Sequence, residues 1–437
     1  MTLDALQELI AVPSVSGDPA HRRDVQRAAA WLADRLRPFG GRVVPTPGHP
    51  LVMGEWLGAE GRPTILVYAH YDVQPPGDAS AWRTPPFEPS VRDGRVYGRG
   101  ASDDKGPMLA ALAAVERLAG EGRSPVNVRF VLEGEEEIGS PSLEAALLSH
   151  RDELSADLAV SADGAMWSAE QPSLNLAARG MLAATVTVRG PAFDLHSGRH
   201  GGAVDNPARA LSQLLASLHG SDGTVAVDGF LDDVVELADN DRAEIAQMPF
   251  DDDAYRAEVG VPELWGEPGF SALERLTARP TLEVSMVEAG GRYTVIPAVA
   301  RAYVTCRLVP DQDPDRVAAA LARHLIHHCP PSVTVDVEQE PGAIPAYAIR
   351  RDHPALRAAE QALGEIYPGR QVLRTRAGGT LPAAVLLRRA LGLDTLFFSF
   401  SSTDEGFHGP NEFFRLSRLE EGTRAWMRLL ELLGERL

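Results

Sequence analysis

Lysine is almost absent from this chain of 437 residues, in which Lys105 is the only one among many arginines. Codon bias is the plainer explanation. The alternative is that Lys105 occupies a place that the larger arginine side chain cannot fill. Cysteine is also scarce, and the two present, Cys306 and Cys329, cannot build a disulfide framework. Cysteine usage therefore indicates a reducing compartment.

Long apolar runs are missing as well, and negative charge outweighs positive charge. No apolar run approaches the length of a membrane-spanning helix. The first residues, MTLDALQELIAV, contain an early acid and no basic segment, unlike a signal peptide. The formal net charge of −19 makes nucleic acid and anionic membranes poor partners. We therefore expect a cytoplasmic protein with neither nucleic-acid nor membrane partners.

Strand-like and helix-like patterns alternate in the first part of the chain. Strands are predicted at 64–69, 126–132 and 158–161, and an alanine-rich helix is predicted at 107–118. Such alternation is typical of an α/β sheet, in which sites form at the carboxyl ends of strands. We therefore expect functional residues directly after these strands.

The pattern changes in the middle of the chain and then returns. We predict an α/β fold, with a catalytic domain of a mixed β-sheet flanked by helices, built from residues 1–178 and 346–437. Residues 179–345 are predicted to form an inserted α+β domain of about four strands and two helices. Within it, the segment 221–279 is acidic, with short predicted helices and no evident role.

Acidic and histidine residues follow all three predicted strands. His70 and Asp72 are two residues apart and would face the same side of a strand. Asp72 could then fix the tautomer of a ligand imidazole. Three adjacent glutamates, 135–137 in EGEEEIGS, repel one another at a strand end, so solvent, arginine or metal must offset their charge.

A hydrolytic metal site needs ligands for the ion and a free base that takes a proton from water. Adjacent glutamates can divide these two tasks. Asp103 in GRGASDDKGP, Asp163 in SADG and His408 in FHGPNE would complete such a site. Two histidines and several carboxylates without cysteine match a two-metal hydrolase, with ions about 3.5–4 Å apart. A structural zinc site fits less well, because such sites favour closed Cys/His sets.

Seven motifs occur in order over most of the chain: YAHYDVQPPG, YGRGASDDKGP, EGEEEIGS, SADG, DLHSGRHGGAVDNP, TVIPAVARAYVTCRLVP and HGPNE. Together they resemble the carnosinase-like cytosolic dipeptidases, in the co-catalytic metallopeptidase family that also contains aminoacylases, acetylornithine deacetylases and glutamate carboxypeptidases. The resemblance implies a homodimeric exopeptidase that hydrolyses the amide bond of dipeptides or short peptides. It also implies two divalent metal ions per subunit, zinc or else manganese.

The resemblance assigns the metal ligands residue by residue. His70 and Asp163 would hold one ion, and Glu137 and His408 would hold the other. Asp103 would bridge the two ions.

It also implies the catalytic roles. Glu136 would be the general base that activates the bridging water, and Asp72 would orient His70. Glu135 is left over, and we expect it to be solvated or to lie just behind the ligands.

The inserted domain would be the lid and dimerisation domain. His196 would reach the partner's active site and stabilise the oxyanion. Arg307 would bind the substrate's terminal carboxylate through its guanidinium fork. Thr294 and Thr380 match positions that line the substrate pocket.

One departure from the family pattern leaves alternatives open. The family's dipeptidases carry REGGS where this chain has RAGGT, so Ala377 replaces an acid suited to the substrate's free amino group. Glu405 or Asp404 is a hypothetical replacement. An N-acyl-amino-acid or carbamoyl amidohydrolase is the alternative function. A catalytically inactive binding protein is a further alternative, which the complete set of implied ligands disfavours.

Overall fold

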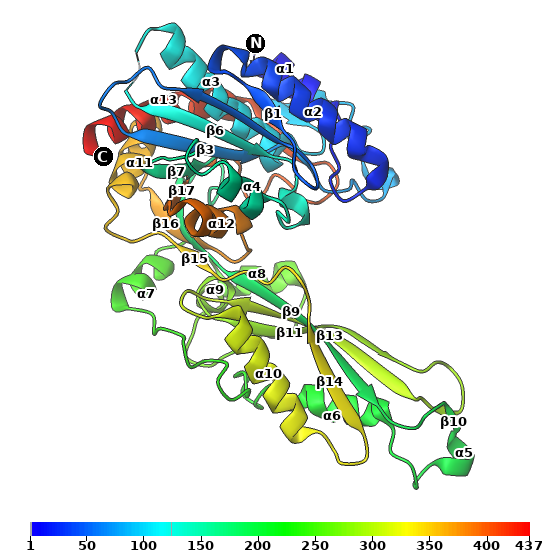
Figure 1. Ribbon diagram of the computed structural model, residues 1–437. Coiled ribbons are helices and arrows are strands. Elements are labelled where there is room, and N and C mark those ends of the chain that lie inside the picture. Colours follow the sequence, from blue (N-terminus) through cyan, green and yellow to red (C-terminus); the bar gives the residue numbers. More distant parts are fainter. Residues whose placement is uncertain (1, 124) are drawn as a thin grey trace. The chain divides into compact units, whose positions relative to one another are not determined.

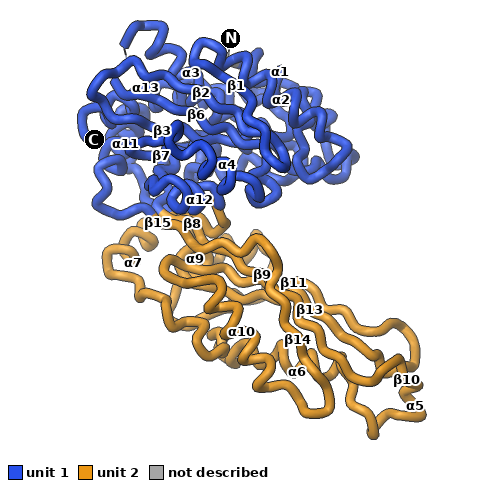
Figure 2. The backbone as a smooth tube through the Cα atoms, in the orientation of Figure 1, with its two compact units in different colours: residues 1–176, 349–375, 382–437 blue, residues 177–348, 376–381 orange. Residues whose placement is uncertain are grey.

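The computed structural model describes residues 2–123 and 125–437, and the chain divides into two compact units (Figure 2). Unit 1 comprises the chain up to Leu176 together with residues 349–375 and 382–437. Unit 2 comprises residues 177–348 and 376–381. The short segment 376–381 thus belongs to unit 2, although the sequence analysis placed it with the second part of the catalytic domain.

Unit 1 contains a mixed six-stranded sheet in the order β1-β2-β6-β3-β7-β17. Its strands are β1 (Arg42–Val44), β2 (Leu51–Trp56), β3 (Thr64–His70), β6 (Asn127–Glu133), β7 (Leu158–Ser161) and β17 (Thr395–Phe397). β3 runs parallel to β6 and β7, and β17 runs parallel to β7, whereas β2 is antiparallel to both β1 and β6. The carboxyl ends of β6, β3 and β7 therefore meet at one edge of the sheet.

Helices flank this sheet, which confirms the predicted α/β class. They are α1 (Thr2–Ile10), α2 (Arg22–Arg35), α3 (Gly106–Gly120), α4 (Leu143–Ser149), α11 (Pro354–Ile366), α12 (Pro382–Leu391) and α13 (Leu416–Arg436). α3 packs against α1 and α13, α11 packs against α13, and α4 packs against α12 (Figure 1). The small side chains of α3 allow this close packing, and residues 106–115 are all buried.

Short elements complete unit 1 and carry the loops of the candidate site. β18 (Phe413–Arg415), β5 (Arg95–Tyr97) and β4 (Ser90–Arg92) form a three-stranded sheet in that order. A π-helical turn, η4 (Ala101–Lys105), leads directly into α3. The 3₁₀ turns are η1 (Pro19–His21), η2 (Arg37–Phe39), η3 (Ala79–Ala81) and η5 (Glu136–Ile138).

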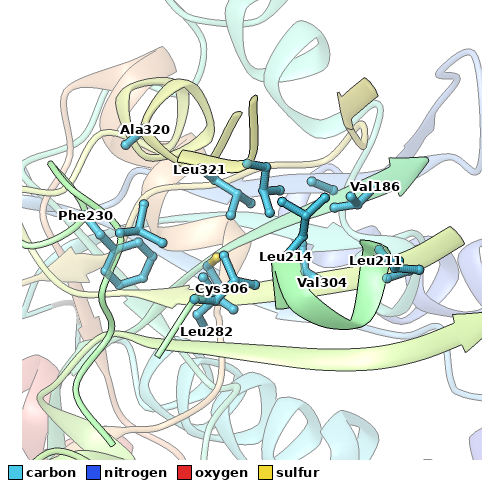
Figure 3. Packing of buried hydrophobic residues seen from close by; sticks show 14 of the residues in the cluster. Val186, Leu211, Leu214, Phe230, Leu282, Val304, Cys306, Ala320 and Leu321 are labelled. Carbon is cyan, nitrogen blue, oxygen red and sulfur yellow. The ribbon is translucent and has the colours of Figure 1, made fainter. Parts of the chain in front are cut away.

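Unit 2 is built on an antiparallel sheet in the order β11-β13-β9-β14. Its strands are β9 (Gly180–Arg189), β11 (Thr281–Ala289), β13 (Val299–Leu308) and β14 (Thr334–Gln339). Alternate residues of β13 are buried, and α6 (Pro207–Ala216) and α10 (Pro314–His328) pack on that face. Figure 3 shows Leu214, Val304 and Leu321 meeting in this apolar core.

The remaining elements of unit 2 are short. The acidic segment contains α7 (Asp239–Ala246), α8 (Asp252–Val259) and α9 (Ala272–Thr277), in agreement with the short helices predicted there. β10 (Leu195–His196) pairs with β12 (Val295–Ile296), and α5 (Ser197–His200) follows β10. A separate sheet, whose residues do not all belong to unit 2, has the strand order β15 (Tyr347–Ala348), β8 (Ser173–Ala178) and β16 (Leu373–Ala377). No helix among the described residues is both long and apolar enough to span a membrane.

Candidate metal centre

Asp103 lies between two histidines in unit 1. Its Oδ1 is 3.0 Å from Nε2 of His70, and its Oδ2 is 3.1 Å from Nε2 of His408. Oε2 of Glu137 is 3.2 Å from the same nitrogen of His408. A carboxylate whose two oxygens face two different imidazoles is arranged to bridge a pair of ions.

Three of the candidate ligands lie at or just after the end of a strand, and the other two lie in a turn and a loop. His70 is the last residue of β3, Glu137 lies in η5 just after β6, and Asp163 follows β7 by two residues. Asp103 lies in η4, and its peptide bond to Asp104 is cis. His408 lies in the loop between β17 and β18 and has a φ of 58°. The sheet topology therefore assembles residues from distant parts of the chain.

Two groups of possible metal ligands result, His70 with Asp103 and Asp163, and Asp103 with Glu137 and His408. Within each group the ligand atoms lie within 4.8 Å of one another. Ligands about 2.0–2.1 Å from a tetrahedral ion are about 3.3 Å apart, close to the contacts observed around Asp103. The two groups thus fit two divalent ions that share Asp103.

The charge balance of the centre also favours cations. Asp103, Glu136, Glu137 and Asp163 gather here, and no arginine or lysine among the described residues forms an ion pair with them. Burial raises the pKa of Asp163 to about 6 and raises the pKa of Glu136 well above its ordinary value. Two divalent ions would supply the positive charge that these carboxylates need.

The two imidazoles respond to the same carboxylates. Hydrogen bonds with Asp103 and Glu137 raise the pKa of His408 to about 10. Burial acts to lower the pKa of His70, but hydrogen bonds with Asp103 and Asp72 raise it above its ordinary value. Burial acts to raise the pKa of Asp103, but hydrogen bonds from His408 and His70 lower it. Ion binding must therefore displace protons from these histidines.

Asp72 contacts both the imidazole of His70 and the backbone that carries Glu136 and Glu137. Its carboxylate oxygens accept the backbone N–H groups of Glu136 at 3.2 Å and Glu137 at 3.1 Å. Its Oδ1 is 3.5 Å and its backbone carbonyl oxygen 3.1 Å from Nδ1 of His70. The Glu136 carboxylate itself forms no hydrogen bond with any described residue. That carboxylate lies beside the ligands and is free to handle a proton.

Glu135 differs from its neighbours. We expected it to be solvated or just behind the ligands, and the first alternative is wrong, because it is only 3% exposed. Its Oε1 accepts the backbone N–H of His49 at 2.7 Å, and its Oε2 accepts that of Ser142 at 3.1 Å. A side chain at Gly48 would collide with this carboxylate. Backbone amides thus compensate the charge of Glu135, whereas Glu137 is itself a candidate ligand and Glu136 lies beside the ligands.

Of two further residues near the centre, Gln74 was missed as a contributor, and Lys105 was singled out only as a lysine that arginine could not replace. Gln74 donates its backbone N–H to Oε1 of Glu137 at 3.1 Å and its side-chain Nε2–H to Oε2 at 3.0 Å. Its position in HYDVQ, four residues after His70, is the only signal in the sequence. Lys105 is fully buried and donates to the carbonyls of Leu9 and Val12, both at 3.0 Å. Its compact ammonium satisfies carbonyls where α1 ends.

The four predicted residues of unit 2 lie in two places. His196 is exposed, and its Nδ1 accepts the backbone N–H of Gly198 at 3.1 Å. The carbonyl of Thr294 accepts from the backbone and the side chain of the next residue, Ser197, both at 2.9 Å. Elsewhere in the unit, Nη1 of Arg307 donates to Oγ1 of Thr380 at 2.8 Å. The roles assigned to these four predicted residues stay predictions.

The hypothesis that Glu405 replaces the acid missing at Ala377 is wrong. Glu405 has no exposed surface, and its carboxylate accepts from the hydroxyl of Ser102 and from Arg415. Asp404 pairs with the same arginine at 2.5 Å, which leaves it a poor partner for a substrate amine. Glu405 is therefore not available to bind a free amino group of a substrate.

The fold and this centre agree with what the chain is similar to. The model of Peptidase family M20/M25/M40 matches residues 66–432, and the chain belongs to this family. The resemblance inferred from the seven motifs is thereby confirmed, and the chain is a hydrolase of the metallopeptidase type.

Individual relatives are similar over nearly the whole chain. Beta-Ala-His dipeptidase of Homo sapiens is 30% identical, covering 97% of this chain and 88% of that protein. Cys-Gly metallodipeptidase dug1 of Schizosaccharomyces pombe is 28% identical, covering 96% of this chain and 92% of that protein. The crystal structure of an M20 family metallo-carboxypeptidase, Sso-CP2 from Sulfolobus solfataricus, matches with a TM-score of 0.87 and 27% identity over 99% of both chains.

Proposed function

We propose that this chain is a two-metal exopeptidase that hydrolyses dipeptides or very short peptides. The position of Asp103 between two ligand groups, with the Glu136 carboxylate beside them, is the observation that carries the proposal. Relatives named as dipeptidases, similar over almost the full chain, support the choice of substrate.

The residues of the centre would divide the chemistry. Two divalent ions held there would polarise the scissile carbonyl and lower the pKa of water. Glu136 would take a proton from the attacking water and deliver it to the leaving amine. Because burial raises the pKa of Glu136, this carboxylate holds a proton more tightly than an exposed glutamate does. Asp72 would hold His70 and the backbone of Glu136 during both transfers.

Residues of unit 2 would bind and orient the substrate. Arg307 would pair with the terminal carboxylate, and the hydroxyl of Thr380 would hold the guanidinium in place. His196 would donate a hydrogen bond to the developing oxyanion in the active site of a second subunit, and Thr294 beside it would line the pocket. The mixed imidazole and carboxylate ligands suit zinc, with manganese as the alternative.

An N-acyl-amino-acid or carbamoyl amidohydrolase is the second candidate. Ala377 offers no charge for a free amino group, and Glu405 is fully engaged inside unit 1. A blocked amino terminus needs no such charge.

Hydrolysis of a matched pair of substrates by the zinc-loaded protein tests the function. One substrate is a free dipeptide and the other is the same dipeptide with an acetylated amino terminus, with Glu136→Ala as the control. Cleavage of the free dipeptide is expected. Preference for the acetylated form would favour the amidohydrolase, and equal activity in the control would overturn the site.

We also propose that the protein is a cytoplasmic homodimer and that β11 pairs across the interface. β11 and β14 are the two edge strands of the sheet in unit 2. β11 exposes Val284, Met286 and Val287 by 40%, 43% and 57%, whereas the exposed residues of β14 are all polar, among them Glu338. Met286→Lys is therefore expected to yield monomers in light scattering, and Glu338→Lys is not. A dimer that persists in Met286→Lys would contradict this interface.

A further inference from the structure

We infer that the buried ion pair between Arg99 and Glu412 is a positioning element that holds the loops carrying Asp103 and His408 in register for the ions. Nη1 of Arg99 is 2.7 Å from Oε2 of Glu412, and both side chains are at most 2% exposed. The inference rests on the two-metal site proposed above and assigns a role to residues that touch neither substrate nor ions.

The carboxylate of Glu412 accepts hydrogen bonds from the backbone of the loop that carries Asp103. Its Oε1 accepts the N–H groups of Ser102 at 2.9 Å and Asp103 at 3.1 Å, and its Oε2 accepts that of Gly100 at 2.9 Å. Three backbone donors thus converge on one side chain that lies 309 residues from Asp103 in sequence. The orientation of the Asp103 carboxylate depends on this loop.

Arg99 contacts both Glu412 and the loop that carries His408. Its Nη2 donates to the carbonyl of Gly409, the next residue after His408, at 3.1 Å. The guanidinium fork therefore joins Glu412 and Gly409, and through Glu412 it joins the two loops. Displacement of either loop would change the distance between Asp103 and His408, which share an ion in the proposed site.

The path of the Asp103 loop shows that it has little freedom. Gly100 has a φ of +81°, and a side chain there would collide with Val73. The hydroxyl of Ser102 donates to Glu405, which is also buried. Side chains behind metal ligands typically change metal affinity 10- to 100-fold when they are removed. We therefore expect the loss of Glu412 to weaken ion binding more than it lowers the stability of the fold.

Titration of the metal-free protein with Zn²⁺ alone, by calorimetry, tests the inference. Glu412→Gln replaces one acceptor oxygen by an NH₂ group that faces backbone donors. We expect the variant to bind Zn²⁺ about 10- to 100-fold more weakly. Wild-type affinity in Glu412→Gln would overturn the inference.

Glu267→Gln is the matched control. Glu267 forms a fork with Arg279 in unit 2, with both contacts at 2.7 Å, and both side chains are mostly buried. Urea unfolding of the two variants compares their losses of stability. We expect Glu267→Gln to lower stability and keep its Zn²⁺ affinity. An equal loss of affinity in this control would show a general effect of instability and would overturn the inference.

Arg99→Lys keeps the positive charge beside Glu412 and serves if Glu412→Gln fails to fold. A lysine ammonium lacks the fork that reaches Gly409 as well, so the loop of His408 is released. We expect the binding of one of the two ions to weaken about tenfold or more while the other changes less. Two unchanged binding constants would overturn the inference. If the wild-type protein binds two ions but hydrolyses no peptide, the proposed function alone would be overturned.

Discussion

The two units bury charged side chains to different extents: unit 2 buries Glu274 and Arg279, outside its core cluster, and unit 1 buries many more. Unit 1 buries charged groups around its candidate centre, among them Asp72, Arg99, Lys105, Glu135 and Glu412. The core cluster of unit 2 consists of apolar side chains and one cysteine, and His196 on that unit is exposed. Burial of charge costs stability unless hydrogen bonds compensate for it, as the backbone donors around Glu135 and Glu412 do.

This contrast indicates that the candidate ligands in unit 1 are held rigidly by the groups around them. Side chains held by several buried hydrogen bonds keep ligands in place without rearrangement during a reaction. Exposed groups on unit 2 suit binding, where adjustment to a substrate or a second subunit is useful. A change of the candidate base in unit 1 should therefore affect chemistry, whereas changes in unit 2 should affect stability or binding.

The largest effect is expected from Glu136→Gln. Loss of a general base lowers kcat by about 10²- to 10⁴-fold, while Zn²⁺ affinity and stability stay near wild type because the Glu136 side chain forms no hydrogen bond with any described residue. Steady-state kinetics and Zn²⁺ titration measure the two properties. Glu135→Gln is the neighbouring control, expected to lower stability and keep kcat. A larger fall of kcat in Glu135→Gln would reverse these assignments.

The next largest effect is expected from Leu321→Ala in unit 2. Leu321 has no exposed surface and lies in the apolar core, so the cavity should cost about 2–5 kcal/mol of unfolding free energy. Ile326→Ala on the same helix is the control, because Ile326 is 60% exposed and its loss should change stability by less than about 0.5 kcal/mol. Urea unfolding measures both. Similar stabilities of the two variants would contradict a tightly packed core.

The sequence was sufficient for the main strands of unit 1 but not for the contacts that surround the candidate ligands. The predicted strands at 64–69, 126–132 and 158–161 correspond closely to β3, β6 and β7, because buried parallel strands form clear apolar runs. β1 and β2 were missed, since they are short, and β2 contains a glycine.

The buried carboxylates explain the remaining failures. Glu135, Glu405 and Glu412 are surrounded by backbone and arginine donors from distant segments. Composition and spacing report that a residue is acidic, but not which N–H groups converge on it. For that reason solvent remained one of the two expected surroundings of Glu135, and Glu405 remained a hypothetical partner for the amino group of the substrate. Only the folded chain shows that both are structural.

A smaller effect is expected from Arg307→Lys, which tests the binding role of unit 2. A lysine cannot form the two parallel hydrogen bonds of a guanidinium with a carboxylate. We expect KM for a dipeptide to rise about tenfold, equivalent to about 1.4 kcal/mol, with kcat little changed. Steady-state kinetics measure both constants. A fall in kcat with an unchanged KM would place Arg307 in the chemical step instead.

The smallest effect is expected in how stability depends on pH. Glu133 in unit 1 is buried and accepts the hydroxyl of Tyr68 at 2.6 Å. Burial raises its pKa from 4.5 to about 8, so the folded protein holds this proton more tightly than the unfolded chain does. The contribution to stability is complete below the unfolded pKa and is lost as the pH rises towards the folded one.

Glu133→Gln removes this titration without changing the shape of the side chain. Between about pH 5.5 and about pH 6.5, the wild type should lose up to about 1.4 kcal/mol of stability relative to the variant. Urea unfolding of the metal-free proteins at both pH values measures the difference. Leu321→Ala, which alters only apolar contacts, should keep a constant offset from wild type. A constant offset for Glu133→Gln as well would mean that Glu133 is already ionised in the folded protein.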